Sequence, residues 1–352
     1  MKQDPQDNVQ SDAPLEKEAV VSLAHGNGGR LTKELIESVF VQCSSSKKLD
    51  TKHDSVSLVL PSNELCMTTD SFVVQPLEFP GGTIGSLSVY GTINDLSVIG
   101  AKPLYISTAF IIEEGLKVDE LVRIVKSMNE AAASANVEIV TGDTKVVPKG
   151  NGGGLYINTT GVGVTDGYPH LDMSLIMPGD HILVSGPIGD HGIAVLLARE
   201  EFGLKGNVLS DCGSVFPLTE AVKSTEGIRF MRDPTRGGLA TVLHEIAEET
   251  GLDVIVDEAV IPIRPEVLSV CEMLGYDPFV LACEGRVVAI TSCESSSTIL
   301  EKWRALPQGK EAEVIGAIYP SVNSRARVVL NTQLGGQRFI EQLEDDPLPR
   351  IC

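Results

Sequence analysis

The stretch IGSLSVYGTINDLSVIGAKPLYISTAFII, residues 84–112, predicts a helix that is followed directly by a strand. Residues 84–99 have helical length, and Gly100 ends this helix before Pro103. Residues 104–112 form an apolar run that predicts a strand. A helix and a strand of this length, next to each other in the chain, indicate a domain built from layers of helices and sheet.

The same alternation extends outward from this stretch. Two apolar runs, 55–60 and 64–69, flank Pro61-Ser62-Asn63 and predict a hairpin whose second strand ends on Asp70. Further along we expect strands at 137–140, 155–164, 182–184, 254–263, 287–291, 313–318 and 327–330, and helices at 118–136, 193–201, 215–223 and 238–250. Because strands and helices alternate throughout, the predicted fold class is α/β or α+β.

The chain of 352 residues is long enough for about two domains. Its first residues are polar and lack the apolar core of a signal peptide, so we expect a disordered leader there. Pro178-Gly179 is the best candidate for a seam between domains. The expected division is a leader at 1–19, an N-terminal domain at 20–177, a C-terminal α/β domain at 178–340 and a mobile tail at 341–352.

The composition argues against some classes of partner. The formal net charge is -20, and no cluster of lysines and arginines interrupts it, which argues against nucleic acid. No run approaches the roughly 18 consecutive apolar residues that a membrane span needs. The seven cysteines form no C-x-x-C pair, which argues against a disulfide framework and a zinc site. We therefore expect a cytoplasmic protein that binds neither nucleic acid nor membrane.

Acidic residues stand where predicted strands end. Asp70 follows the strand at 64–69, Asp143 follows a later short strand, and Asp95 lies in the helix between them. Ligands of α/β layers bind beyond the carboxyl ends of strands, and Mg²⁺ takes one or two carboxylates together with substrate phosphates. Each aspartate alone is commonly a turn or surface residue. Their convergence predicts a metal-phosphate site, to which Lys145 would add a cation.

The pair Asn94-Asp95 is the strongest of these signals, because the rest of its helix is apolar and punctuated by glycines. Buried charges persist only when they are paired or bound to a metal. For this pair a functional position is therefore favoured over a surface position.

Three further motifs carry groups suited to anions or to proton transfer. His25-Gly26-Asn27-Gly28-Gly29-Arg30 offers backbone N–H groups that would fold over phosphates, although a surface turn explains it as well. Arg232-Asp233-Pro234-Thr235-Arg236-Gly237-Gly238 leads into a helix N-terminus, which binds an anion or is simply capped by Asp233 or Thr235. Cys283-Glu284-Gly285 places a carboxylate just before a strand, as a base or as the end of a turn.

The chain ends in Pro349-Arg350-Ile351-Cys352, with a thiol on the last residue. A chain end is held by little local packing, so this cysteine is either a stray surface thiol or a group that can enter an active site. Pro347 and Pro349 favour an extended tail, and the stretch from Leu343 onward would reach roughly 30 Å at about 3.3 Å per residue.

Taken together, these segments resemble the HypE family of hydrogenase maturation proteins, carbamoyl dehydratases of the aminoimidazole ribonucleotide synthetase and selenophosphate synthetase superfamily. The resemblance covers about residues 20–352 and runs through residues 25–29, 69–74, 79–82, 91–96, 141–147, 189–192, 232–238 and 349–352. Several of these motifs are shared across the superfamily, whereas the terminal tetrapeptide is specific to the family. One departure is Cys283, where the family pattern has asparagine, and this leaves the contacts of that residue open.

The resemblance implies a fold of two α/β domains, with the N-terminal sheets of two subunits paired in a homodimer and with ATP and Mg²⁺ near that seam. It implies that the carbamoyltransferase HypF loads a carbamoyl group onto Cys352 and that ATP drives its dehydration from S-carboxamide to S-cyanide. The cyanide then passes through a HypC–HypD complex to the iron of nickel-iron hydrogenase.

The resemblance also assigns roles to residues of this chain. The metal ligands would be Asp70, Asp95 and Asp143; the ATP site would comprise His25, Gly28, Gly29, Asp70, Asn94, Asp95, Asp143 and Asp233; and the catalytic residues would be Cys352, Lys145 and Glu284. Cys352 would carry the substrate, while Lys145 and Glu284 would remove protons from the carboxamide nitrogen.

Two other functions compete with this one. An ATP-dependent kinase or synthetase of the selenophosphate synthetase type would act on a free small molecule, but such an enzyme carries a reactive Cys or selenocysteine near its N-terminal glycine loop, where this chain has His25. A non-catalytic scaffold would bind nucleotide and merely carry a thiol.

Overall fold

The computed structural model describes residues 20–27, 29–49, 55–62, 64–165, 167, 170–199, 203–322 and 325–341. The expected leader at 1–19 and the expected tail from 342 to Cys352 lie outside these residues, as does Gly28.

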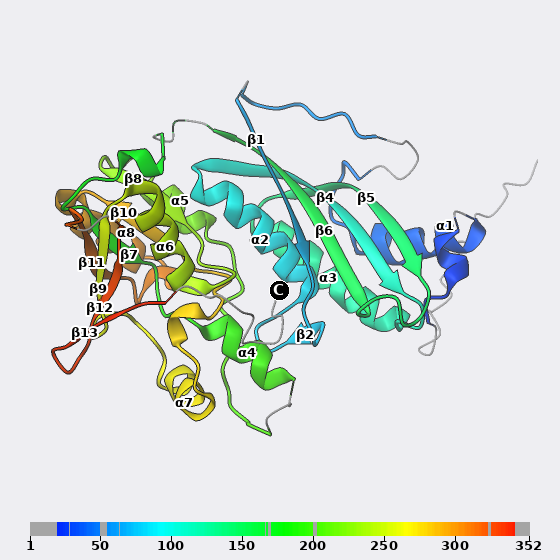
Figure 1. Ribbon diagram of the computed structural model, residues 1–352. Helices are drawn as coiled ribbons and strands as arrows, with labels where there is room; N and C mark the ends of the chain where they lie inside the picture. Colours follow the sequence, from blue (N-terminus) through cyan, green and yellow to red (C-terminus); the bar gives the residue numbers. More distant parts are fainter. Residues whose placement is uncertain are drawn as a thin grey trace, which may run out of the picture.

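The N-terminal half is built on a four-stranded sheet with the strand order β1-β6-β4-β5. Its strands are β1 (Leu65–Phe72), β4 (Ala101–Glu113), β5 (Glu138–Val147) and β6 (Leu155–Thr165), of which only β4 and β5 pair in parallel. Helices α2 (Ile84–Val98) and α3 (Val118–Ser134) cover one face (Figure 1). The smaller elements are η1 (Leu23–Gly26), α1 (Arg30–Leu35), η2 (Ile36–Val41), β2 (Glu78–Phe79) and β3 (Gly82–Thr83).

Helix α2 lies between the two halves of the chain and is buried on nearly every side. Thr83 caps it, because its side chain accepts hydrogen bonds from the N–H groups of Gly85 and Ser86. Gly85 permits close packing on α3, since a Cβ there would lie 2.3 Å from the carbonyl oxygen of Ile124. A helix buried on all sides must satisfy its polar side chains within the protein, and Ser86, Ser88 and Ser97 do so by donating hydrogen bonds to carbonyl oxygens of the preceding turn.

The C-terminal half is built on a seven-stranded sheet with the order β13-β12-β9-β11-β7-β10-β8. These strands are β7 (His181–Val184), β8 (Ile228–Arg232), β9 (Asp253–Asp257), β10 (Val288–Thr291), β11 (Glu313–Tyr319), β12 (Val328–Asn331) and β13 (Gln337–Phe339). The helices are α4 (Asp190–Ala198), α5 (Phe216–Val222), α6 (Gly238–Thr250), α7 (Pro265–Leu274) and α8 (Cys293–Arg304), with short turns at Met173–Leu175, Pro278–Val280 and Pro307–Gly309. Two sheets with helices confirm the predicted mixture of α and β structure.

The predicted hairpin around Pro61 is wrong. Residues 55–60 form no strand, and β1 pairs with β6 over its whole length, from Leu65 opposite Val164 to Phe72 opposite Ile157. Val59 is 87% exposed, so the upstream run buries too little apolar surface to gain from pairing.

Several predicted boundaries also move. Strand β5 does not end at Gly142-Asp143 but runs on to Val147, because β4 offers it a parallel partner as far as Glu113. Helix α4 begins at Asp190, directly after Gly189 with its left-handed φ of 82°. Helices α7 and α8 have no counterpart among the expected elements.

Strand β6 belongs to the first sheet and β7, the next strand along the chain, to the second. The predicted domain boundary at 177/178 lies between these two strands and stays a prediction. Among the described residues, no helix combines the length and the apolar character that crossing a bilayer requires.

Candidate active site

Four acidic residues gather where the two halves meet, and we call Asp70, Asp95, Asp233 and Glu284 the acidic cluster. Asp70 comes from β1, and Asp95 comes from α2, which packs against β1. Thr68 Oγ1, also on β1, donates a hydrogen bond to Asp95 Oδ2 at 2.9 Å. Asp233 and Glu284 come from loops of the C-terminal half, so each half supplies two carboxylates.

Burial raises the pKa of all four carboxyl groups, and repulsion by neighbouring carboxylates adds to it at Asp95, Asp233 and Glu284. Burial, followed by the charge of Asp95, raises the pKa of Asp233 to about 7. Burial, followed by the charges of Asp233, Asp211, Asp70 and Asp95, raises the pKa of Glu284 well above its ordinary value. The pKa values of Asp70 and Asp95 are also raised, chiefly by burial. Carboxyl groups in this state are suited to bind a cation or to hold and release a proton.

Two exposed arginines oppose the negative charge of the cluster. Arg232 lowers the pKa of Asp95 and Asp233, and Arg236 lowers that of Asp70, although burial outweighs both effects. Neither Asp233 nor Thr235 caps the following helix: the N-cap of α6 is Gly237, which makes no side-chain hydrogen bond. Simple helix capping, one explanation of this motif, is therefore wrong.

A cavity of about 870 Å³ lies at the edge of the N-terminal sheet that is farthest from β1, against the edge strand β5. Helices α1, η2 and α3 border it, and its lining combines apolar side chains with the polar stretch 141–145. The rings of Phe40 and Phe110 meet edge to face there, with centroids 4.8 Å apart. Asp143 and Lys145 both line this cavity, as does Gly26. A cavity of this size and mixed lining suits a small organic ligand.

The three predicted metal ligands do not come together within one chain. Asp70 pairs with Thr159, Thr159 with Thr108, and Thr108 with Gly142, so Asp70 and Gly142 share one face of the sheet. Asp143, the next residue, points to the other face. It also lies three strand spacings from Asp70, roughly 14 Å at about 4.8 Å per spacing. In the part of the chain that the structure covers, no three His, Cys, Asp or Glu residues form a metal site.

Asn94 joins the two halves through its side chain. It is 1% exposed, and its Nδ2 donates to the carbonyl oxygens of Gly213 at 3.0 Å and Glu284 at 3.3 Å. Its Oδ1 accepts a hydrogen bond from the N–H of Val215 at 2.9 Å. Every polar atom of the side chain thus serves the backbone of the C-terminal half. The sequence placed Asn94 in the ATP site. We propose instead that Asn94 positions the site and does not contact the nucleotide.

The glycine-rich N-terminal motif lies beside β5, at the cavity. A Cβ on Gly26 would lie 2.7 Å from that of Val146, which explains the glycine there. His25 Nδ1 lies 2.9 Å from Ser22 Oγ, so this nitrogen is engaged in the local turn. The N–H of Gly29 donates to Asn27 Oδ1. The predicted ATP residues that the structure describes, Asn94 aside, therefore fall into two sets: Asp70, Asp95 and Asp233 at the acidic cluster, and Asp143 at the cavity with His25 and Gly29 in the adjoining motif.

Cys283 makes a structural contact in the C-terminal half. It is fully buried, and its Sγ accepts a hydrogen bond from the N–H of Gly189 at 3.2 Å, next to the start of α4. Asp211 was not predicted, although its charge acts on Glu284 and its side chain is 1% exposed. An aspartate in a polar loop carries no motif that would have identified it.

Comparisons with known proteins cover almost the whole chain. Residues 53–165 match the family described as AIR synthase related protein, N-terminal domain, and residues 177–329 match its C-terminal domain. The carbamoyl dehydratase HypE of Azotobacter vinelandii is 44% identical over 333 residues, which cover 94% of this chain and 97% of that protein.

Two solved structures resemble the fold over most of its length. The crystal structure of the hydrogenase maturation protein HypE in complex with ATP has a TM-score of 0.89 at 43% identity, covering 94% of this chain and 99% of the other. The crystal structure of a HypE-HypF complex contains a chain with a TM-score of 0.76 at 42% identity, covering 89% of this chain and 100% of the other.

Proposed function

The chain belongs to the HypE family of carbamoyl dehydratases, and from this premise we propose that it uses ATP to convert a carbamoyl group on the thiol of Cys352 into a thiocyanate for the cyanide ligands of nickel-iron hydrogenase. The acidic cluster carries the proposal, because it places a buried glutamate beside carboxylates suited to a metal-bound phosphate. The family assignment favours this reaction over a kinase that acts on a free small molecule.

The reaction requires one oxygen and two protons to leave the carboxamide. Its oxygen attacks the γ-phosphorus of ATP, ADP departs, and the nitrogen loses a proton to give an O-phosphorylated imidate. The carbon–oxygen bond then breaks, phosphate leaves with its electron pair, and loss of the second proton completes the carbon–nitrogen triple bond. Glu284 and Lys145 are the proposed acceptors of these protons, directly or through water.

The acidic cluster fits Mg²⁺. Asp70 and Asp95 supply the one or two carboxylates that Mg²⁺ usually takes, and substrate phosphates would complete its coordination. A bound Mg²⁺ would neutralise charge on the phosphates, which with positioning is most of phosphoryl-transfer catalysis. A cation held by Asp70 and Asp95 would also offset their charges, which add to burial in raising the pKa of Glu284, and so would lower the pKa of that carboxyl group.

We propose that a second subunit unites the two sets of ATP residues. The sheet face opposite α2 exposes Leu65 and Met67 of β1 and Ile111 of β4, with exposed fractions of 51%, 65% and 41%. Asp143 and Lys145 point from this same face. Pairing of two such faces would bring Asp143 of the partner subunit toward the acidic cluster, with ATP spanning from that subunit's cavity.

Mixing two inactive variants tests this arrangement. Asp95→Asn disables the acidic cluster and Lys145→Ala disables the cavity set, so each homodimer should be inactive. After random exchange of subunits, half of the dimers combine both variants, and one of their two sites is intact, which restores about a quarter of the activity. Two Asp95→Asn preparations mixed with each other are the control. No recovery after proven exchange would show that each site lies within one subunit.

The reaction itself is tested by intact-mass analysis of the tail. We expect the loaded chain, carbamoylated by HypF from carbamoyl phosphate and ATP, to lose the mass of one water only when ATP and Mg²⁺ are present. Cys352→Ala should never load. A carbamoyl adduct that persists under these conditions would refute the dehydratase function, and a kinase of free substrates would leave the tail unmodified. The same assay with HypC–HypD added tests the proposed transfer of cyanide to that complex.

A further inference from the structure

The backbone around Glu284 is held from two sides. Its N–H donates to Asp211 Oδ1 at 3.1 Å, and the N–H of Gly285 donates to Asp211 Oδ2 at 3.3 Å. Its carbonyl oxygen accepts from the N–H of Gly213 at 3.2 Å and from Asn94 Nδ2. The Asp211 carboxylate thus accepts hydrogen bonds from two successive N–H groups, those of Glu284 and Gly285. The Glu284 carbonyl, which lies between these N–H groups, is held by Gly213 and by Asn94 of α2.

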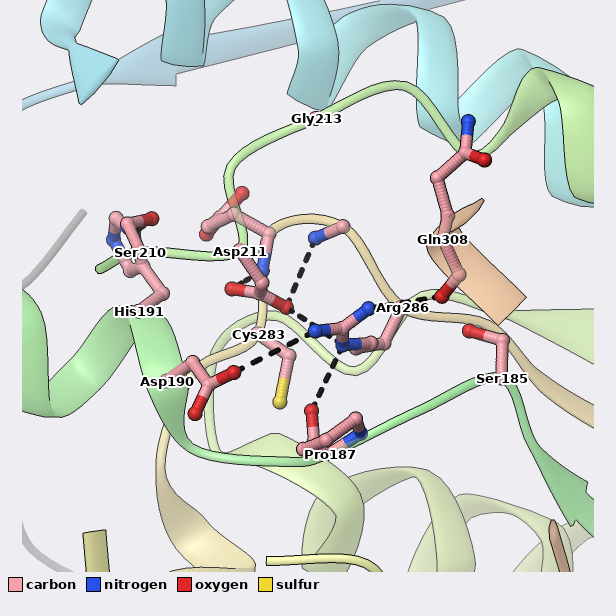
Figure 2. Close-up of polar contacts among 12 residues, drawn as sticks. Ser185, Pro187, Asp190, His191, Ser210, Asp211, Gly213, Cys283, Arg286 and Gln308 are labelled. Atoms are coloured by element: carbon pink, nitrogen blue, oxygen red, sulfur yellow. Dashed lines mark hydrogen bonds and ion pairs between the residues drawn. The ribbon is translucent and has the colours of Figure 1, made fainter. Parts of the chain in front are cut away.

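The Asp211 carboxylate is itself fixed by a buried arginine. Arg286, which is 8% exposed, lies with its Nε 3.4 Å from Asp211 Oδ2, and its Nη2 lies 3.5 Å from Asp190 Oδ2. Figure 2 shows the guanidinium between these two carboxylates, with further contacts to Pro187 and Gln308. These are hydrogen bonds from Nε to the Pro187 carbonyl at 2.8 Å and from Nη1 to the Gln308 carbonyl at 3.2 Å.

The loop at 211–213 and the segment 284–285 pack directly against each other. A Cβ on Gly285 would lie 1.9 Å from the carbonyl oxygen of Asp211, a distance that no side chain tolerates. The peptide units on both sides of Glu284 therefore cannot turn without breaking hydrogen bonds or colliding with the loop at 211–213. The direction in which Glu284 leaves the backbone is set by this contact.

We infer that Asp211, anchored by Arg286, is a positioning residue for dehydration: it holds the backbone of Glu284 so that the carboxyl group is aimed into the acidic cluster. The inference rests on the proposed role of Glu284 as a proton acceptor. Placement of a reacting group within a fraction of an ångström affects rates strongly. A buried residue that never touches substrate can therefore limit the reaction.

Asp211→Asn is the informative variant. The amide keeps one acceptor oxygen but turns an NH₂ group toward the second backbone N–H, and it loses the ion pair with Arg286. Because misplacing a reacting group by about 1 Å can cost about 100-fold in rate, we expect the single-turnover rate of dehydration to fall about 10- to 100-fold. The affinity for ATP, measured by calorimetry on the full chain, should stay within about twofold, because Asp211 is not among the residues at the cavity.

A double-mutant cycle with Glu284→Gln separates positioning from damage to the fold. If Asp211 acts through Glu284, Asp211→Asn should have no further effect in the Glu284→Gln background. If it slows both backgrounds equally, Asp211 acts elsewhere and the inference is overturned while the proposed function stands. If Glu284→Gln alone leaves the rate unchanged, the role of Glu284 fails and the inference fails with it.

Asp253→Asn is the matched control. Asp253 is 4% exposed, its Oδ1 accepts from the backbone N–H of Arg327 at 3.0 Å, and its Oδ2 pairs with the guanidinium of the same residue at 3.0 Å. It lies on β9, in a similar environment but away from the acidic cluster. We expect a similar loss of urea resistance in both variants but a slower dehydration only in Asp211→Asn. Equal slowing per folded molecule in both would refute the positioning role.

Discussion

Replacing Asn94 by alanine should destabilise the fold more than a typical polar substitution. The change removes two hydrogen bonds donated by Nδ2 and one accepted by Oδ1. The Glu284 carbonyl keeps the N–H of Gly213, whereas the Gly213 carbonyl and the Val215 N–H lose their side-chain partner. Each buried polar group left unpaired costs about 1–3 kcal/mol. With lost packing, we expect the free energy of unfolding to fall by about 3–5 kcal/mol.

Urea denaturation measures this loss directly. Trp303, the only tryptophan, is fully buried in the C-terminal half and donates from Nε1 to the carbonyl of Leu218, so its fluorescence reports unfolding there. Far-ultraviolet circular dichroism reports the whole chain, and coincidence of the two transitions justifies a two-state treatment. Asn129→Ala is the control, because its amide donates to the Val125 carbonyl of its own helix and, among the described residues, to no group of the C-terminal half. We expect that variant to lose less than about 1 kcal/mol.

One result would refute this reasoning. If Asn94→Ala and Asn129→Ala cost the same within about 0.5 kcal/mol, the contacts of Asn94 across the two halves carry no special energy. The role of Asn94 as the connection between α2 and the loop at 211–215 would then be wrong.

Three further predictions concern packing, charge and the cavity. Gly85→Ala should cost about 2–4 kcal/mol in unfolding free energy, since its Cβ would collide with the Ile124 carbonyl, and an equally stable variant would disprove the close approach. The raised pKa of Asp233, about 7, means that the metal-free native state holds a proton that the unfolded state releases, so the contribution of Asp233 to stability is fully present below about pH 4 and is lost by about pH 7. Asp233→Asn should flatten that part of the curve in urea titrations without Mg²⁺, and an unchanged slope would contradict the assignment. Phe40→Ala should weaken ATP binding about tenfold or more in calorimetry by opening the cavity, and unchanged affinity would place the nucleotide elsewhere.

The sequence indicated that Asp70 and Asp95 lie close together, but not that Asp143 points to the opposite face of the sheet. Asp70 and Asp95 could be placed together because a strand end and a neighbouring helix usually face one site. The side of the sheet on which Asp143 lies depends on the register of β5 against β4, which shifts between Ile106 and Ser107. A shift of one residue reverses the face, and no local pattern in the sequence records it.

Side chains that bind to backbone groups were the other part of the site that the sequence could not predict. The polar pair in α2 indicated that a partner must exist, but the partners of Asn94 are main-chain groups of the other half, which leave no trace in residue type. The same holds for Asp211, whose carboxylate binds two N–H groups. The predicted hairpin was wrong for a different reason: residues 55–60 resemble a strand locally, but they bury too little apolar surface.

The position of Asn94 and Asp95 on α2 also restricts how the gene can change. Neighbouring residues of a helix point about 100° apart, so Asn94 reaches the C-terminal half while Asp95 reaches Thr68 and the acidic cluster. Deleting a single codon between Thr83 and Asn94 would set the carboxylate of Asp95 against the Gly213 carbonyl, and inserting one would set the side chain of Ile93 there. Point substitutions can accumulate on this helix over evolutionary time, but its length before Asn94 cannot drift.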